Sequence, residues 1–230
     1  MIEENYREVE ARVREAAIRS GRTPEEVTLI AVSKTKPLSD IEALIRIGVR
    51  EFGENKPQEL KEKFDSVSQP VHFHQIGHLQ TNKVKYVIDR AVLIHSVDSV
   101  HLAEQIQKEA EKRGVTAEVL IEVNAAEEDT KFGVTLADAP GLVREISAFP
   151  NIHIKGLMTI APFVDDPEEN RPVFRAMKQL LLDIKSQKIH NVDMSVLSMG
   201  MTNDFEVAIE EGATMVRVGT AIFGEREYNV

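Results

Sequence analysis

The chain has 230 residues, of which 42% are hydrophobic, and this is enough to bury the core of one domain. Its 38 acidic residues outnumber its 28 basic ones, and the formal charge of −10 argues against a nucleic-acid partner. The sequence contains no cysteine, which excludes disulfide frameworks, thiolate metal sites and cysteine nucleophiles.

The first segment is predicted to be an amphipathic helix that ends near Gly21. Apolar residues recur in it three or four positions apart with charges between them, at Ile2, Tyr6, Val9, Val13 and Ala17. This segment lacks the basic-then-apolar order of a signal peptide, and no stretch approaches the roughly 18 apolar residues of a membrane span. We therefore expect a cytoplasmic protein without a membrane partner.

Eight short apolar runs follow, separated by longer amphipathic segments. The runs are 28–33, 49–53, 71–76, 91–97, 117–123, 152–158, 194–197 and 214–218, and the helical segments are 40–47, 57–64, 81–88, 100–113, 136–148, 168–186 and 204–210. This alternation is typical of βα units on a parallel sheet. It predicts an α/β fold with one domain, residues 1–230, forming a single (β/α)8 TIM-type barrel with an extra N-terminal helix. An open doubly wound sheet is the alternative, but no GxGxxG follows the first run.

Two longer irregular stretches, 125–135 and 161–167, each follow a predicted strand. Because active sites of such barrels lie at the C-terminal ends of the strands, these loops are candidates for a lid. The interpretation of both stretches as ordinary surface loops has equal support.

Lys34 closely follows the first run, at the end of the barrel where sites lie. Partial burial lowers the pKa of a lysine and makes its amine a nucleophile toward a carbonyl, so this position suits a Schiff base. An ordinary lysine whose amine reaches solvent is the alternative interpretation. Lys36, which precedes Pro37, is the second candidate.

The loops after the seventh and eighth runs resemble phosphate-binding loops. Ser198, Met199 and Gly200 follow one run, Gly219 and Thr220 follow the other, and a short helix is expected to begin at Thr220. Barrels of this type commonly bind phosphate with these two loops and a short helix. Together with Lys34, these loops indicate a ligand that carries both a phosphate and an aldehyde.

Arg217 lies between Val216 and Val218 and is therefore expected to point into the barrel. One interpretation is an ion pair with an acidic residue such as Glu54. The other is a hydrogen bond to a pyridine nitrogen, which a guanidinium would keep unprotonated.

The histidines do not show the spacing of a metal site. His72 and His74 are interpreted as core or rim residues, and His95 as a hydrogen-bonded residue of the barrel. His78 follows Gly77 at a strand end, where contact with a ligand is one of two interpretations.

The sequence resembles the pyridoxal phosphate homeostasis proteins over almost its whole length. The motifs that carry the resemblance are AVSKTKP (31–37), FGEN (52–55), HQIGHLQTNK (74–83), GLMTI (156–160), LSMGM (197–201) and VRVGTAIFG (216–224). The resemblance implies a barrel similar to the N-terminal domain of alanine racemase, with pyridoxal 5′-phosphate as the cofactor. Two mild departures from the usual pattern are Phe73 and Thr202.

The same resemblance implies roles for individual residues. Lys34 would anchor the cofactor and Arg217 would face its pyridine nitrogen. Ser198, Met199, Gly200, Gly219 and Thr220 would form the phosphate loops, and Asn55 would be a further contact.

Two functions compete for such a site. Racemization by two bases requires a proton carrier opposite Lys34, and the only tyrosines, Tyr6, Tyr86 and Tyr228, are not at predicted strand ends. The sequence ends at Val230, directly after the predicted barrel and without a second domain. We therefore expect a protein that buffers or delivers the cofactor, with no catalytic residues and no efficient activity.

Apo forms of enzymes that use this cofactor are candidate partners, and a monomer is expected. A racemase-like enzyme with weak activity is the alternative, and a sugar-phosphate enzyme is a third candidate.

Overall fold

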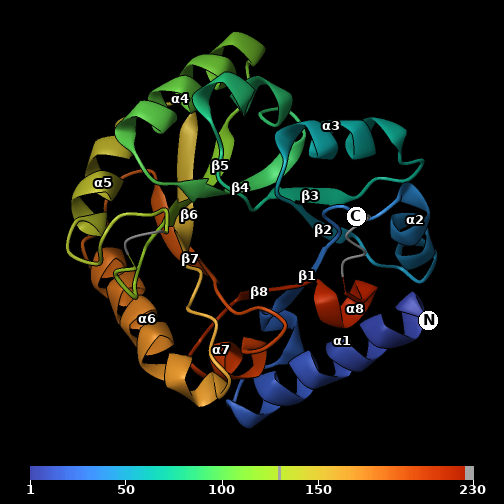
Figure 1. The fold of residues 1–230 in the computed structure, drawn as a ribbon. Helices are drawn as coiled ribbons and strands as arrows, with labels where there is room; N and C mark the ends of the chain where they lie inside the picture. Colours follow the sequence, from blue (N-terminus) through green and yellow to red (C-terminus); the bar gives the residue numbers. More distant parts are fainter. Residues whose placement is uncertain (129–130, 226–230) are drawn as a thin grey trace.

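The computed structural model is a closed barrel of eight parallel strands surrounded by helices (Figure 1). It describes residues 1–128 and 131–225, so residues 129–130 of the loop 125–135, Tyr228 and Val230 lie outside the described residues. The strands are β1 (Thr28–Val32), β2 (Glu51–Glu54), β3 (His72–Gln75), β4 (Ala91–Val97), β5 (Ala117–Glu122), β6 (Ile152–Met158), β7 (Val192–Ser198) and β8 (Met215–Val218). Each strand pairs with its neighbours in sequence, and β8 closes the barrel against β1. The predicted TIM-type barrel is confirmed.

The outer layer is formed mainly by α-helices. These are α1 (Ile2–Arg19), α2 (Leu38–Arg46), α3 (Pro57–Ser66), α4 (Val100–Arg113), α5 (Ala139–Ile146), α6 (Arg171–Ser186), α7 (Phe205–Glu210) and α8 (Thr220–Phe223). Short 3-10 helices occur at η1 (Pro24–Glu26), η2 (Thr81–Tyr86) and η3 (Pro167–Asn170). Among the described residues, no helix is both long and apolar enough to cross a bilayer.

Two of the differences between the predicted and the observed helices lie in the segments 81–88 and 136–148. The sequence predicts an α-helix over 81–88, but a 3-10 helix spans Thr81–Tyr86, as is common in short connectors. Helix α5 begins at Ala139 and not at 136, because a proline at the second helical position sets its start.

The extra helix α1 lies along the outside of the barrel next to α7 and α8 (Figure 1). Its apolar stripe is buried as the spacing predicts, with Tyr6, Val9, Val13, Ala16 and Ala17 facing the core. This packing covers the part of the wall where β8 meets β1.

The alternation of side chains along the strands divides the interior into two parts. Outward-facing residues such as Val216 and Val218 join the main core between strands and helices. Inward-facing Leu93, Leu120 and Met158 form a separate cluster inside the barrel. The buried polar side chains of His74, His95, Ser198 and Arg217 are connected by hydrogen bonds inside the barrel, and Arg217 lines the site at the C-terminal ends of the strands.

Candidate functional site

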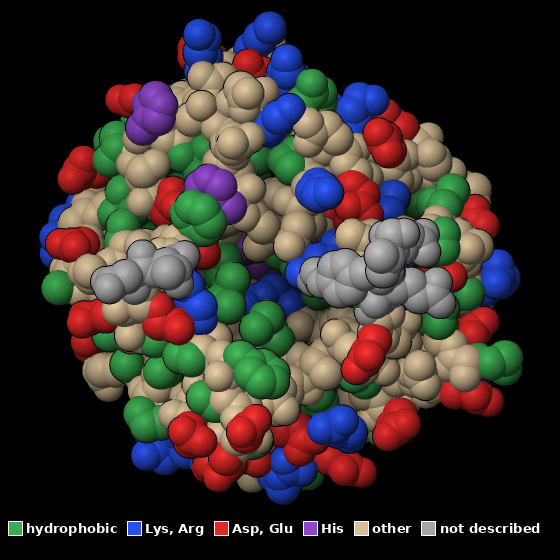
Figure 2. Space-filling view, viewed as in Figure 1, with side chains coloured by type: hydrophobic (Ala, Val, Ile, Leu, Met, Phe, Trp, Pro, Cys, Tyr) green, Lys and Arg blue, Asp and Glu red, His purple; other side chains and the backbone are tan. Residues whose placement is uncertain are grey.

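A cavity of about 760 Å³ lies at the C-terminal end of the barrel. Its size falls within the range of about 300–1,000 Å³ that is usual for small-molecule sites. Figure 2 shows the hollow in this face, with basic side chains at its floor and hydrophobic side chains around it. Five of the eight residues that the sequence predicts for the site line this cavity: Lys34, Asn55, Arg217, Gly219 and Thr220.

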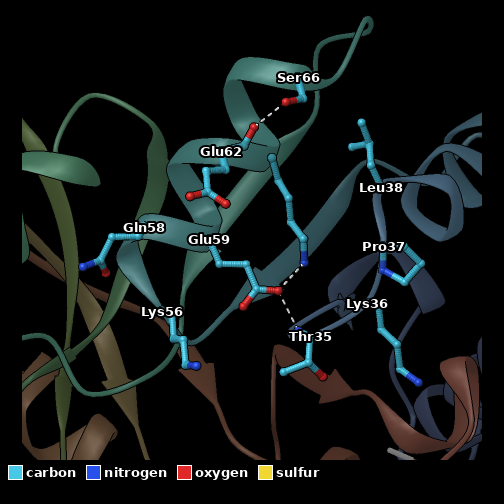
Figure 3. Close-up of a pocket in the computed structure, with 10 residues that line it drawn as sticks. Thr35, Lys36, Pro37, Leu38, Lys56, Gln58, Glu59, Glu62 and Ser66 are labelled. Atoms are coloured by element: carbon cyan, nitrogen blue, oxygen red, sulfur yellow. Dashed lines mark hydrogen bonds and ion pairs between the residues drawn. The ribbon is translucent and has the colours of Figure 1, made fainter. Parts of the chain in front are cut away.

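Lys34 occupies a turn whose backbone is held on both sides. On one side, Lys63 Nζ donates a hydrogen bond of 2.7 Å to the Ser33 carbonyl. On the other, the backbone N–H of Thr35 donates to Glu59 Oε1 over 2.6 Å (Figure 3). Thr35 has a φ of 64°, a left-handed conformation that is costly for a β-branched residue. The surrounding contacts therefore impose the backbone path that presents half-buried Lys34 to the cavity.

Lys36, the second lysine candidate, lies elsewhere. Its Nζ donates to the carbonyl of Phe223 (3.0 Å), the last residue of α8, and to that of Glu225 (3.3 Å), just beyond it. It lines a neighbouring groove of about 880 Å³ between the turn and α3 (Figure 3). The structure thus separates the two lysines and places Lys34 alone of the pair in the cavity.

Asn55 reaches the cavity wall because the loops after β2 and β3 approach each other closely. Gln75 Nε2 donates to the carbonyls of Asn55 (2.8 Å) and Gly77 (3.1 Å). A Cβ on residue 77 would lie 2.7 Å from the Asn55 carbonyl oxygen, so this position requires glycine. The nearby His78 also lines the cavity, as one of its two interpretations predicts.

Arg217 points into the barrel and is almost fully buried. Nη1 donates to Ser198 Oγ over 2.6 Å, and Nη2 donates to the Thr159 carbonyl over 2.9 Å. These bonds use two of the five N–H donors of a guanidinium. Burial lowers the pKa of Arg217 to about 10, against the attraction of Glu122 and Asp204, so the side chain is charged at neutral pH.

The alternative ion pair between Arg217 and Glu54 does not form, because Glu54 pairs with Lys63. The Nζ–Oε1 distance of that pair is 2.7 Å. Arg217 is therefore available to a ligand in the cavity it lines.

The structure does not bring three predicted residues to the cavity wall. Ser198 is fully buried, and its hydroxyl contacts Arg217 and His95. Met199 is also fully buried, and Gly200 packs on α7, where a Cβ would meet that of Ala208 at 2.6 Å. These residues lie behind the wall and shape the loop that follows them.

That following loop supplies wall residues that the sequence interpretation did not assign to the site. Met201, Thr202 and Asn203 line the cavity. The Asp204 carboxylate accepts a hydrogen bond of 2.8 Å from the N–H of Met201 and thereby closes the loop. Thr202 directly follows the glycine-containing motif 197–201, and this position is the sequence feature that points to its hydroxyl as a wall group.

Gly219 and Thr220, which follow β8, line the wall next to the loop that follows β7. A Cβ on residue 219 would lie 3.3 Å from the Val32 carbonyl oxygen, so β8 and β1 approach closely here. Helix α8 begins at Thr220, as the sequence predicts.

An acidic residue that the sequence interpretation missed also lines the cavity. Glu122 ends β5, and its side chain is 5% exposed. Its buried Oε2 has no hydrogen-bond partner among the described residues. Burial and the neighbouring Asp98 raise the pKa of Glu122 to about 7, while Arg217 acts in the opposite direction. The sequence feature that could identify Glu122 is its position, as an acidic residue, near the C-terminal end of a predicted strand.

Apolar and aromatic side chains surround the mouth of the cavity. Phe163 is 87% exposed, and Phe132 stacks on His78 with a centroid separation of 3.8 Å. Both loops that the sequence marks as lid candidates thus contribute a cavity residue. Within residues 1–128 and 131–225, no cluster of three or more His, Asp or Glu side chains has the arrangement of a metal site.

His72, His74 and His95 follow their predicted placements. His74 is 2% exposed and belongs to the core, and His72 lies at the rim. His95 is fully buried and hydrogen-bonded to His74 and Ser198, which confirms its interpretation as a barrel residue.

The fold and the cavity define a parallel barrel with a lysine and an arginine facing one site. Residues 2–227 match the family model described as alanine racemase, N-terminal domain. A pyridoxal phosphate homeostasis protein from Aquifex aeolicus is 44% identical over 94% of this chain and 95% of its own length. Its Escherichia coli counterpart is 36% identical over 99% and 98%, respectively. The chain therefore belongs to the pyridoxal phosphate homeostasis protein family.

Solved structures agree with this assignment. A protein of unknown function from Bifidobacterium adolescentis has a TM-score of 0.89 and 37% identity, covering 96% of this chain and 94% of that one. PipY from Synechococcus elongatus, solved with PLP bound, has a TM-score of 0.80 and 33% identity, covering 92% and 98%. Alanine racemase from Clostridium difficile shares the fold, with a TM-score of 0.74 and 13% identity over 98% of this chain and 58% of its own.

Proposed function

We propose that this protein binds pyridoxal 5′-phosphate as a Schiff base on Lys34 and serves in the intracellular homeostasis of the cofactor, by buffering or delivering it. The observation that carries this proposal is that Lys34, in the turn after β1, and Arg217, on the neighbouring strand β8, face the same cavity. The bound cofactor of PipY supports it, because that protein shares this fold at 33% identity.

The residues present fit the chemistry of this cofactor. When bound, pyridoxal phosphate supplies an aldehyde that condenses with amines and a ring that withdraws electrons. Lys34 offers the amine, and Arg217 offers charged donors to the ring nitrogen. Because a guanidinium does not readily surrender a proton, Arg217 favours an unprotonated ring nitrogen and restrains the electron-withdrawing power of the ring.

The phosphate is proposed to bind where the loops after β7 and β8 meet the cavity. Gly219 and Thr220 keep the role that the sequence predicts for them, and Thr202 adds a hydroxyl from the neighbouring loop. Ser198, Met199 and Gly200 are proposed to act indirectly, because Ser198 holds Arg217, Met199 is buried in the core and Gly200 packs on α7 just before the 201–203 loop. Asn55 is proposed as a further contact from the wall opposite this loop.

Buffering or delivery is favoured over racemization by the openness of the site. The cavity mouth carries exposed side chains such as Phe163, and such access suits exchange of the cofactor more than protection of a reactive carbanion. The relatives are named as homeostasis proteins and not as enzymes. Apo forms of enzymes that use this cofactor are the proposed recipients. Incubation with L-alanine tests the racemase alternative, since inversion at about 1–1,000 per second would establish enzymatic turnover.

The decisive experiment compares the absorption spectra of the wild type, Lys34→Ala and Lys36→Ala after addition of pyridoxal phosphate. The visible band of a Schiff base is expected in the wild type and in Lys36→Ala, and it should be absent from Lys34→Ala. A band that persists in Lys34→Ala would overturn the assignment of Lys34, and its loss from Lys36→Ala would then assign the Schiff base to Lys36.

A further inference from the structure

A chain of buried hydrogen bonds connects the cavity to the opposite end of the barrel. Arg217 Nη1 lies 2.6 Å from Ser198 Oγ, which lies 2.9 Å from His95 Nδ1. His95 Nε2 lies 2.9 Å from His74 Nδ1, and His74 Nε2 lies 2.8 Å from Glu51 Oε2. Glu51 is the first residue of β2, so the chain ends at the N-terminal rim of the barrel.

The chemistry of the two terminal groups, Arg217 and Glu51, sets a single direction of donation along this chain of hydrogen bonds. A guanidinium only donates, so the Ser198 hydroxyl accepts from Arg217 and donates its own hydrogen to His95 Nδ1. His95 must then carry its proton on Nε2 and donate to His74 Nδ1. His74 in turn donates from Nε2 to Glu51, whose carboxylate only accepts. Every donor in the chain therefore points from the cavity toward Glu51.

Burial favours this arrangement with a neutral imidazole at His95. Ser198 and His95 are fully buried, and His74 is 2% exposed. Burial, followed by the nearby His74 and Arg217, holds the pKa of His95 well below its usual range. In the low-dielectric interior of the barrel, aligned hydrogen bonds polarise one another. The positive guanidinium of Arg217 and the negative carboxylate of Glu51, at the two ends of the hydrogen-bond chain, favour the same alignment.

We propose that these five residues form a directional hydrogen-bond relay that fixes the guanidinium of Arg217, which makes Glu51 a positioning residue for the cofactor site. The role toward the cofactor rests on the proposed function, because it requires Arg217 to face the pyridine ring. The direction of the relay does not require it, because that direction is a property of the protein alone.

The opposite direction leaves a polar group unsatisfied. If His95 donated from Nδ1, the Ser198 hydroxyl would accept from both His95 and Arg217. Within the part of the chain that the structure describes, the hydrogen bonds of this hydroxyl are those to Arg217 and His95. Its hydrogen would then lack an acceptor inside the barrel, and an unpaired buried donor is destabilising.

The first test needs no substitution. Nitrogen-15 NMR of histidine-labelled protein, without and with pyridoxal phosphate, distinguishes the two neutral tautomers of each ring. The relay requires the Nε2–H tautomer for both His95 and His74. A His95 ring that carries its proton on Nδ1, or on both nitrogens at neutral pH, would overturn the proposal whether or not the cofactor binds.

The second test replaces Glu51, the acceptor at the end of the relay, with a donor. In Glu51→Lys a donor-only ammonium replaces the acceptor, so His74 and then His95 should shift to the Nδ1–H tautomer. Affinity for pyridoxal phosphate should fall about fivefold or more, as expected when one hydrogen bond to Arg217 is disturbed. Glu51→Gln retains an acceptor oxygen, and it should keep the wild-type tautomers and lose less affinity than Glu51→Lys.

The matched control is Glu118→Lys, which makes the same change of charge. Glu118 is half-exposed on β5 and lies 3.9 Å from His153, outside the relay. This variant should retain the wild-type tautomers and affinity. Equal losses of affinity in Glu51→Lys and Glu118→Lys, or a tautomer shift in Glu51→Lys without a loss, would rule out Glu51 as a positioning residue. Failure of the wild type to form a band on Lys34 would instead count against the proposed function.

Discussion

The Lys63 ammonium and the Glu54 carboxylate form an ion pair of 2.7 Å beneath the turn that carries Lys34. Lys63 also donates to the Ser33 carbonyl and the Glu59 carboxylate, each over 2.7 Å, so all three of its N–H groups are used. Glu54 is fully buried, and burial raises the pKa of its carboxyl despite the attraction of Lys63. Lys63 thus both balances a buried carboxylate and fixes the backbone next to Lys34.

Lys63→Met is therefore expected to lower the free energy of unfolding by about 3–5 kcal/mol, because it leaves Glu54 buried without its cation. Chemical denaturation measures the change. The double variant Lys63→Met/Glu54→Gln removes both charges and should recover part of the loss. Equal destabilisation in the single and double variants would show that packing, and not the ion pair, stabilises this region.

Arg217→Ala is expected to weaken binding of pyridoxal phosphate by about tenfold to a hundredfold, the usual effect of losing a hydrogen bond that involves a charged group. Arg217→Lys keeps the charge but loses the planar arrangement of donors, so its affinity should be intermediate. Fluorescence titration measures both constants, and thermal unfolding confirms that the variants are folded. Wild-type affinity in Arg217→Ala would mean that this side chain serves the barrel and not the ligand.

The architecture could be predicted from the sequence because each barrel unit has a local signature. The bounds of β4 and β6 coincide with the predicted runs 91–97 and 152–158. The alternation around Arg217 correctly placed it inside the barrel, since Val216 and Val218 belong to the outer core. The segment 81–88 was assigned the wrong helix type, because apolar spacing alone does not distinguish a short 3-10 connector from an α-helix.

The site was less accessible to sequence reasoning because it depends on contacts between distant residues. Nothing local to Ser198 indicates that its hydroxyl contacts His95, 103 positions away, and is thereby turned from the cavity. Glu122 was overlooked because its neighbours in sequence are apolar. Its significance arises only where β5 brings it near Asp98 and Arg217.

Gly156 offers a test of how closely β6 and β7 approach. A Cβ on residue 156 would lie 1.7 Å from the Val196 carbonyl oxygen, so Gly156→Ala requires the strands to separate. We expect it to lower the free energy of unfolding by about 3 kcal/mol or more. In Gly141→Ala the new methyl meets nothing within 4 Å and replaces a glycine within α5, so that control should stabilise the protein by about 0.5–1 kcal/mol. A stable Gly156→Ala variant would contradict the close approach of these strands.

Glu122 should make stability depend on pH in a specific direction. Its pKa rises from an ordinary 4.5 to about 7 on folding, so between these values the folded state holds a proton that the unfolded chain has lost. The free energy of unfolding contributed by this residue is therefore greatest below pH 4.5 and falls by about 3 kcal/mol as the pH rises to 7. Glu122→Gln cannot titrate, so its stability relative to the wild type should increase by that amount across the same interval.

Denaturation at a series of pH values measures the difference between Glu122→Gln and the wild type. Asp98→Asn should shift the transition to lower pH, because Asp98 helps to raise the pKa of Glu122. A constant difference between Glu122→Gln and the wild type from pH 4.5 to 8 would mean that Glu122 remains ionised in the cavity.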